Sequence, residues 1–410
     1  MSDCPFRFVH ASDFHLEQPP TGIAEVPDHL RDLFLDAAYT AAEQVFETAL
    51  AEDAELLVLC GDLLCPQYTG PRGPLFLVEH FARLAERGIA VYWAGGSVDP
   101  PEEWPSAVTL PENVHVFPRA RLEEIVHRRE ETPLVRLVGI SRDGQRAIRP
   151  GDFAPDPTGL FTIAVAHAAA DPAALQASGI HYWALGGRHD RSTPLSTPQI
   201  AHYPGSPQGR HPGESGVHGC TLVQVDQQRQ ARTSLIPTDA MRWLSERVVV
   251  DEATSRADLE TLLRERVHTL VEAAPKMVLL ISWTIVGSGP LLSQLRRGNL
   301  AADLLGWLRA EYGSGPPAAW SLSLDVEWSA ALPPEWYEQD TIRGDFLRTV
   351  RQFEISSAEP LGLEACVAEK HLAGTLASAV AVADKAARQR ALREAALLGV
   401  DLLSGEEPQS

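Results

Sequence analysis

Acidic and imidazole side chains stand close behind several apolar runs that are typical of β-strands. The five residues placed in this way are Asp13, His15, Asp62, His167 and His189. Ligands of open α/β sheets bind at the carboxyl ends of the strands, so side chains at several strand ends can converge on one point. Mixed carboxylate and imidazole ligands suit Mn, Fe or Zn better than Ca or Mg. The pattern therefore predicts a transition-metal site.

Each of these residues also has a simpler interpretation when it is taken alone. Asp13 could cap a helix or a turn, and His15 could be an ordinary surface residue. His167 could be a buried histidine whose nitrogens are satisfied by hydrogen bonds. Asp62 is harder to explain by packing, because a carboxylate behind a buried strand is costly unless it is paired or metal-bound. The joint pattern favours the metal site.

Strand and helix patterns alternate along the first 95 residues. Residues 6–11, 55–60 and 89–93 are predicted strands, and helical spacing of apolar residues covers 29–52 and 74–87. The run at 55–60 is continuously apolar, as expected of a strand that is buried on both faces. This βαβαβ order predicts a largely parallel sheet with crossover helices.

Further strands are predicted up to residue 225, and the last of them lie close together with turn residues between them. Their ranges are 134–140, 160–166, 182–185, 199–203 and 221–225. We expect them to form a second sheet of antiparallel character that packs on the first.

The pattern changes near residue 241. Predicted strands at 248–250, 277–286 and 321–328 alternate with predicted helices at 257–273 and 300–312, and the tail from 341 is mostly helical. We expect three parts: a first domain over 1–240, a small α+β domain over 241–340, and a helical segment over 341–410.

The charge balance limits the classes of partner. The 410 residues include 35 basic and 55 acidic residues, a net charge of −20. This argues against binding of nucleic acid by a broad basic surface, but not against a site made electropositive by metal ions. Only three of the 35 basic residues are lysines, and arginine suits bidentate phosphate contacts. Genomic base composition explains the arginine preference equally well.

No apolar run approaches the roughly 20 residues that a membrane span needs, and residues 1–5 do not resemble a signal peptide. We expect a cytoplasmic protein. The five cysteines have no zinc-ribbon spacing, and a disulfide framework is not expected. Cys60 is interpreted as a small apolar filler, and Cys65, although nearer the predicted site, has no evident thiolate-stabilising partner.

The motifs resemble those of the calcineurin-like metallophosphoesterases. The chain carries Asp13-x-His15, Gly61-Asp62, a strand-end His167 and a later His189 in the order of that family. The stretch from Tyr203 to Pro212 resembles the SbcD/YhaO branch of DNA repair exonucleases. The resemblance implies a four-layer α/β/β/α sandwich followed by an α+β capping domain and a helical tail that binds a partner.

In that family two metals share a bridging aspartate and activate a water that attacks phosphorus. The resemblance implies that the first metal takes Asp13, His15, Asp62 and His189, with Mn as the expected ion. The second metal would take Asp62, His167, the Asn of a G-N-H-D motif and the first His of a G-H-x-H motif.

The chain departs from the family at both of those last positions. The segment that should read G-N-H-D is Gly95-Gly96-Ser97-Val98-Asp99, so the catalytic histidine is replaced near Ser97 and no catalytic residue is assigned. Gly187 stands where the first His of G-H-x-H is expected. Loss of a general acid typically costs about 10²–10⁴ in rate. Three compensations stay open: Asp99 or Asp190 as substitute ligands, a single metal acting alone, or Arg188 binding phosphate.

Three functions therefore remain. The chain could be a metal-dependent phosphodiesterase, nuclease-like, that works on DNA with an SbcC/YhaN-type, SMC-like ATPase bound through the C-terminal helices. It could be an inactive scaffold subunit of such a complex, or a phosphoesterase for a small nucleotide. The resemblance also implies a homodimer. The acidic charge favours the small substrate, whereas the capping domain and tail favour the ATPase complex.

Overall fold

The structure is a computed structural model that describes residues 4–23, 26–119, 121–144, 148–169, 171–196, 198–328, 332, 334–356, 361, 363 and 385–403. Cys366 and much of the predicted helical tail, residues 357–360 and 364–384, lie outside the described residues.

The chain divides into two compact units. The first comprises Met1–Ser245, Val271–Ser282 and Arg309–Leu322, and the second Glu246–Leu270, Trp283–Leu308 and Ser323–Ser410. The expected domain limits at residues 240 and 340 stay predictions.

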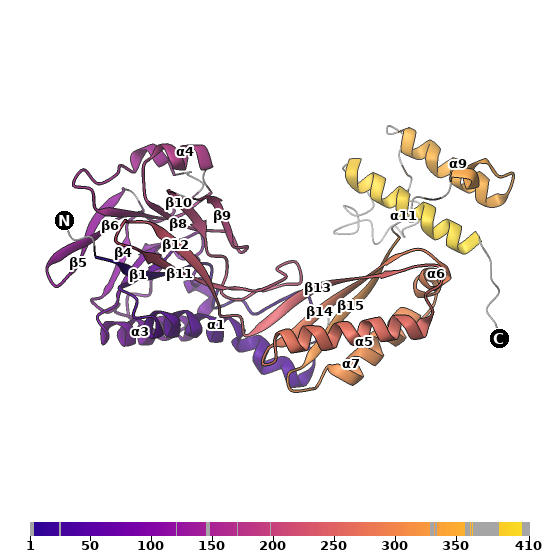
Figure 1. Ribbon diagram of the computed structural model, residues 1–410, viewed down its shortest axis with the longest axis horizontal. Helices are drawn as coiled ribbons and strands as arrows, with labels where there is room; N and C mark the ends of the chain where they lie inside the picture. Colours follow the sequence, from indigo (N-terminus) through magenta and orange to yellow (C-terminus); the bar gives the residue numbers. More distant parts are fainter. Residues whose placement is uncertain are drawn as a thin grey trace. The chain divides into compact units, whose positions relative to one another are not determined.

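The first unit contains a six-stranded sheet in the order β12-β11-β1-β2-β3-β4. Its strands β1, β4, β11 and β12 are labelled in Figure 1. Its strands are β1 (Phe6–Ala11), β2 (Leu56–Leu59), β3 (Ala90–Ala94), β4 (Val114–Phe117), β11 (Gly219–Val225) and β12 (Ala231–Pro237). Strands β1, β2 and β3 are parallel, as predicted, and β4, a strand that the sequence analysis did not predict, continues this parallel order. Strand β11 pairs with β1 antiparallel. The strand predicted at 221–225 therefore belongs to this sheet and not to the second one.

The second sheet has the order β5-β6-β7-β8-β10-β9. Its strands are β5 (Glu123–Arg129), β6 (Thr132–Ile140), β7 (Phe161–His167), β8 (Tyr182–Gly186), β9 (Ser192–Leu195) and β10 (Ile200–Tyr203). The four central strands are parallel, and only the edge strands β5 and β9 pair antiparallel. The expected antiparallel character was wrong: the gaps between the predicted strands are long enough for the crossover connections that parallel strands need.

The position of strand β2 between two apolar cores explains why its sequence is continuously apolar and does not alternate with polar residues. Leu57 and Leu59 face a core shared with helices α1 (Arg31–Ala51) and α3 (Arg72–Ala85), whereas Leu56, Val58 and Cys60 face a core shared with the second sheet. Successive side chains of a strand point to opposite faces, so both faces of β2 are covered.

The layers follow from three apolar cores. One lies between α1, α3 and the first sheet, one between the two sheets, and one between the second sheet and α4 (Pro172–Ala177). The order helix, sheet, sheet, helix is the predicted four-layer α/β/β/α sandwich, which is thereby confirmed. Shorter elements complete this part of the chain: η1 (Asp28–Leu30), α2 (Pro66–Thr69), η2 (Pro101–Glu103) and η3 (Pro150–Asp152).

A three-stranded sheet follows, in the order β13-β14-β15, with β13 (Met241–Val250), β14 (Val278–Gly287) and β15 (Ala319–Trp328). The intervening helices are α5 (Arg256–Ala273), α6 (Pro290–Arg297) and α7 (Leu300–Tyr312), so the predicted β-α-β-α-β order is present. Within the first unit, Met241, Trp243 and Leu280 pack against Phe34 of α1.

The last described helices are α8 (Pro334–Glu338), α9 (Ile342–Ile355) and α11 (Lys385–Leu403). The apolar face of α9 packs on α11 through a cluster that contains Leu347, Val350, Leu392, Ala396 and Val400. Among the described helices there is none of sufficient length and hydropathy to span a bilayer.

Candidate metal centre

Five side chains from the ends of four parallel strands converge in the first unit. Asp13, His15 and His189 form one group of potential metal ligands, and Asp13, Asp62 and His167 form another; within each group the ligand atoms lie within 4.8 Å of one another. Asp13 belongs to both groups. The structure thus brings together every residue of the predicted metal set, and neither group contains a cysteine.

Unusual backbone geometry aims these residues. Asp13, His15 and Asp62 have φ angles of 59°, 47° and 54°, a left-handed conformation that costs free energy for residues other than glycine. The amide of Asp13 donates to the carbonyl of Gly61 at 2.9 Å, and the amide of His15 donates to the carbonyl of Asp62 at 3.0 Å. These bonds tie the loop after β1 to the loop after β2, and they hold the strained residues in position.

Three polar atoms of Asp13 and His15 are buried without a hydrogen-bond partner among the described residues. Oδ2 of Asp13 accepts from the Ser12 hydroxyl at 2.6 Å and from the Gly187 amide at 3.0 Å, but Oδ1 has no partner. Both ring nitrogens of His15 are also without one, and the two residues are 1% and 6% exposed. A buried polar atom left unpaired costs about 1–3 kcal/mol. Such a set of donors fits a bound metal ion.

Burial shifts the pKa values of His15 and Asp13 in opposite directions. Desolvation, with a contribution from the Arg210 guanidinium, lowers the pKa of His15 to about 4. At neutral pH the imidazole is therefore uncharged, which is the form that binds a metal. Burial raises the pKa of Asp13, and the neighbouring His167 acts in the opposite direction.

His167 is oriented by a backbone carbonyl. Its Nδ1 lies 2.8 Å from the carbonyl oxygen of Cys60, so Nδ1 carries the proton and Nε2 keeps its lone pair. Nε2 lies 3.4 Å from Oδ2 of Asp62 and 3.3 Å from the hydroxyl of Ser97. A hydrogen bond from the other ring nitrogen to a backbone carbonyl, as made here by Nδ1, commonly sets the tautomer of metal-binding histidines.

His189 is oriented by Glu214, a residue that the sequence analysis missed. Nδ1 of His189 lies 2.6 Å from Oε1 of Glu214, which is 4% exposed. This hydrogen bond raises the pKa of His189. Burial alone would raise the pKa of Glu214, but hydrogen bonds from His189 and from the Arg210 amide lower it to about 2. No spacing in the sequence marks this pair, because the two residues are 25 positions apart in irregular segments.

Asp99 has a structural position rather than one within either ligand group. Its Oδ1 accepts from the amides of Asp62 at 2.9 Å and Gly96 at 2.5 Å, and its Oδ2 accepts from the amide of Leu63 at 3.0 Å. Burial and the nearby Asp62 carboxylate raise the pKa of Asp99 to about 8. Asp62 in turn accepts from the amides of Ser97 and Val98 at 2.5 and 2.9 Å. Asp99 as a substitute ligand stays a prediction that this bonding does not favour.

Gly187, at the position of the family's first G-H-x-H histidine, and Gly96, one of the two candidates for the family's asparagine, leave no space for a side chain. A Cβ on Gly96 would collide with the Asp62 carboxylate and lie 2.9 Å from Nδ1 of His167. A Cβ on Gly187, where φ is +93°, would lie 2.9 Å from Nε2 of His167. Ser97, by contrast, is exposed and already directs its hydroxyl at His167. The geometry therefore favours the alignment in which Ser97 takes the place of the family's asparagine.

Two arginines lie beside the centre, and the sequence analysis named only one of them. Arg188 is exposed, with its guanidinium carbon 4.7 Å from the centre of the Tyr203 ring. Arg210 is closer to the ligands: Nη2 lies 3.2 and 3.3 Å from the two ring nitrogens of His189. Asp190 is exposed and lies in neither ligand group. The roles predicted for Arg188 and Asp190 stay predictions.

Comparison with curated proteins identifies a relative of this chain. It is 28% identical over 337 residues to the uncharacterized metallophosphoesterase YhaO of Bacillus subtilis, a match that covers 78% of this chain and 81% of YhaO. Over most of its length the chain is therefore similar to a metallophosphoesterase. The SbcD/YhaO branch suggested by the motifs is consistent with this match. No family model matches the chain.

Solved structures similar to this chain include three from different sources. GAP50, described as the anchor in the inner membrane complex of Plasmodium, is 11% identical, with 57% of this chain and 85% of that chain covered and a TM-score of 0.37. A dimetal phosphatase from Danio rerio is 10% identical, with 56% and 98% covered and a TM-score of 0.34. An archaeal phosphodiesterase is 12% identical, with 56% and 99% covered and a TM-score of 0.28.

Proposed function

We propose that this chain is a metal-dependent hydrolase that cleaves phosphodiester bonds. The observation that carries the proposal is the set of three buried, unpaired polar atoms on Asp13 and His15, at the centre of a ligand cluster in a metallophosphoesterase homologue. A catalytically inert scaffold would not need this arrangement, since unpaired buried atoms and left-handed residues both lower stability.

Asp13, His15 and His189 would hold one divalent ion, and Asp13, Asp62 and His167 would hold a second. When bound, such ions polarise a phosphoryl oxygen and lower the pKa of water. The mixture of imidazole and carboxylate donors supports Mn as the ion.

The chain's own residues orient these donors and the substrate. Ser12 and Gly187 engage Oδ2 of Asp13 and leave Oδ1 available. Glu214 engages Nδ1 of His189, which leaves Nε2 as the nitrogen that would bind an ion. The Arg210 guanidinium next to His189 supplies positive charge for a substrate phosphate. The loop 95–99 carries no imidazole that could protonate a leaving group.

The nuclease-like assignment within this function depends on the resemblance to the SbcD/YhaO branch. On that basis we propose DNA as a substrate in the cytoplasm, a homodimer, and an SMC-like ATPase that docks on the C-terminal helices. The face of α9 with Leu347 and Val350 packs on α11, so docking would use the exposed Ile342 and Ile355. Hydrolysis of a small nucleotide is the second candidate, supported by the net charge of −20.

The test is hydrolysis of bis(p-nitrophenyl) phosphate and of linear DNA in the presence of Mn. We expect Asp13→Asn to abolish activity, since Asp13 belongs to both ligand groups. Asp53→Asn is the matched control, because Asp53 is exposed and follows helix α1, away from the centre. Equal background activity in the wild type and in Asp13→Asn would refute the hydrolase and favour the scaffold.

A further inference from the structure

A hollow of about 280 Å³ adjoins the metal centre on the side of His167, which forms part of its wall. Four arginines line it: Arg119, Arg121, Arg142 and Arg149. Two aspartates, Asp143 and Asp152, are the acidic residues among its lining. In a chain with a net charge of −20, this local excess of arginine is unusual. We call this site the arginine hollow.

The four arginines differ in how far they are already bound. Arg119 pairs with Asp143 at 3.3 Å and with Glu102 at 3.4 Å. Nε of Arg142 donates to the carbonyl of Gly144 at 3.0 Å. Arg121 and Arg149 are exposed and have no hydrogen bond or ion pair with any residue that the structure describes. Two guanidinium groups are therefore available for a ligand.

The arginine hollow also has an apolar part. Leu122, Ile140, Ile148 and Phe153 line it, and all four belong to the core on the outer face of the second sheet. Guanidinium groups above an apolar floor suit a ligand that combines an anion with a flat apolar ring, because the arginines bind the anion while the floor contacts the ring.

The arginine hollow is joined to the metal centre by backbone contacts as well as by His167. The amide of Arg142 donates to the carbonyl of Gly95 at 2.9 Å, and the amide of Gly95 donates to the hydroxyl of Ser141 at 2.8 Å. Gly95 begins the loop whose Ser97 and Val98 amides bind Asp62. A substrate phosphate at the ligands would have its neighbouring group in this hollow.

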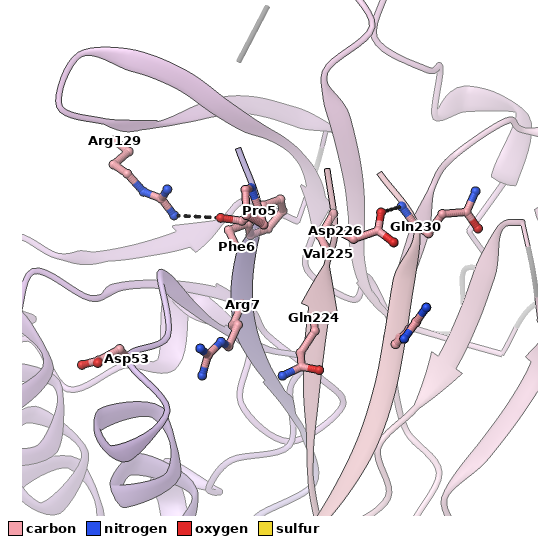
Figure 2. A pocket seen from close by; sticks show the side chains of 10 residues that line it. Pro5, Phe6, Arg7, Asp53, Arg129, Gln224, Val225, Asp226 and Gln230 are labelled. Atoms are coloured by element: carbon pink, nitrogen blue, oxygen red, sulfur yellow. Dashed lines mark hydrogen bonds between the residues drawn. The ribbon is translucent and has the colours of Figure 1, made fainter. Parts of the chain in front are cut away.

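The larger hollow at the opposite end of β1 does not offer the same features. It measures about 480 Å³ and includes Arg7 and Arg129 (Figure 2). Arg7 is paired with Glu52 at 3.2 Å, and Arg129 with Glu55 at 2.7 Å. Arg7 and Arg129 are engaged in these ion pairs, and although Arg232 also lines this hollow, none of the metal ligands does.

We propose that the arginine hollow binds a second phosphate of the substrate, carried by a ring-bearing group that stays attached to the scissile phosphate. The substrate class is thus a nucleoside-type phosphodiester with an additional phosphate, and Arg121 and Arg149 are its specificity-determining residues. The inference rests on the proposed function, since it places the scissile phosphate at Asp13 and its partners.

The test compares two substrates that differ only in the second phosphate: the p-nitrophenyl ester of thymidine 5′-phosphate, and the same ester with a 3′-phosphate. In both, water adds to phosphorus and p-nitrophenol leaves. We expect kcat/KM to be at least tenfold higher for the 3′-phosphorylated ester, mainly through KM. In the double variant Arg121→Ala/Arg149→Ala the ratio should fall to about one.

Arg87→Ala is the matched control, because Arg87 is exposed and lies between α3 and β3, at the strand end opposite the metal ligands. It should keep the preference of the wild type. A wild-type ratio near one, or a preference that survives in the double variant, would overturn the inference. Such results would leave the hydrolase itself intact, since both esters would still be cleaved.

Calorimetric binding without added metal separates the two proposals. We expect thymidine 3′,5′-bisphosphate to bind at least tenfold more tightly than thymidine 5′-phosphate, and the double variant to lose this difference. If neither ester is cleaved but the difference in binding persists, the proposed hydrolase fails and the phosphate site stands. Equal binding of the two nucleotides would overturn the site. Short oligothymidylates, compared with the bisphosphate, identify whether the second phosphate belongs to a strand or to a free nucleotide.

Discussion

Nδ1 of His189 and Oε1 of Glu214 lie 2.6 Å apart. The carboxylate is almost fully buried and has no direct place in the ligand groups, so its effect on the metal acts through the imidazole. Contacts of this type hold a ligand in its tautomer and increase its basicity, and their loss typically costs about 10–100-fold in metal affinity. We expect Glu214→Gln to weaken Mn binding by this amount, measured by calorimetric titration.

Glu52→Gln is the appropriate control for Glu214→Gln. Glu52 also accepts a hydrogen bond from a basic side chain, Arg7, but it lies at the exposed end of α1. The Mn affinity of Glu52→Gln should equal that of the wild type. If Glu214→Gln bound Mn as tightly as the wild type, Glu214 would have no role in orienting His189.

The same pair predicts how stability depends on pH in metal-stripped protein. The lowered pKa of Glu214, about 2 against an ordinary 4.5, contributes stability above pH 4.5 that is lost as the pH falls towards 2. The raised pKa of His189 contributes stability below pH 6.5 that is lost as the pH rises through its folded-state value. The wild type should therefore have a higher free energy of unfolding than Glu214→Gln, and this difference should be largest between pH 4.5 and 6.5. Urea titrations across pH 2–9 measure this difference, and a constant difference would contradict the assignment.

The hydrogen bonds of Asp99 predict that its substitution lowers the free energy of unfolding and leaves the number of bound Mn ions unchanged. Asp99→Ala removes the acceptor of three backbone amides around the centre, and we expect it to lower the free energy of unfolding by about 3 kcal/mol or more. Asp99→Asn retains one acceptor oxygen and should lose less. The number of Mn ions bound by Asp99→Asn should match the wild type; one ion fewer would show that Asp99 is a ligand after all.

Much of the centre could be predicted from sequence because the ligands follow strands with strong apolar runs. Asp13 and Asp62 follow parallel strands of the first sheet, and His167 ends a strand of the second sheet, which packs on the first. Carboxyl ends of parallel strands are where such sites form. The orienting residue Glu214 and the nearby Arg210 lie in irregular segments, where no period of the sequence predicts contact. The sheet to which residues 219–225 belong also depends on long-range pairing with β1, which local pattern does not encode.

The absence of an imidazole on the loop 95–99 predicts a strong dependence on the leaving group. Without a general acid, an alkoxide must depart unprotonated, whereas p-nitrophenolate needs no proton. We expect methyl p-nitrophenyl phosphate to lose p-nitrophenolate readily and dimethyl phosphate to show no detectable hydrolysis with Mn. The slope of log kcat/KM against leaving-group pKa for substituted phenyl esters measures this, and a flat slope would reveal an acid elsewhere in the site.

The glycines near His167 predict which substitution can rebuild a second metal site. Gly96→Asn should destabilise the protein, because its Cβ would lie 2.5 Å from the Asp62 amide nitrogen. Ser97→Asn should be tolerated, since Ser97 is exposed and its hydroxyl lies 3.3 Å from Nε2 of His167. An amide oxygen there would join Asp13, Asp62 and His167 as a ligand, so Mn should bind more tightly at the weaker of the two positions. Thermal unfolding and Mn titration of both variants test this. If Gly96→Asn proved stable and gained the metal while Ser97→Asn did not, the family's asparagine would align with Gly96.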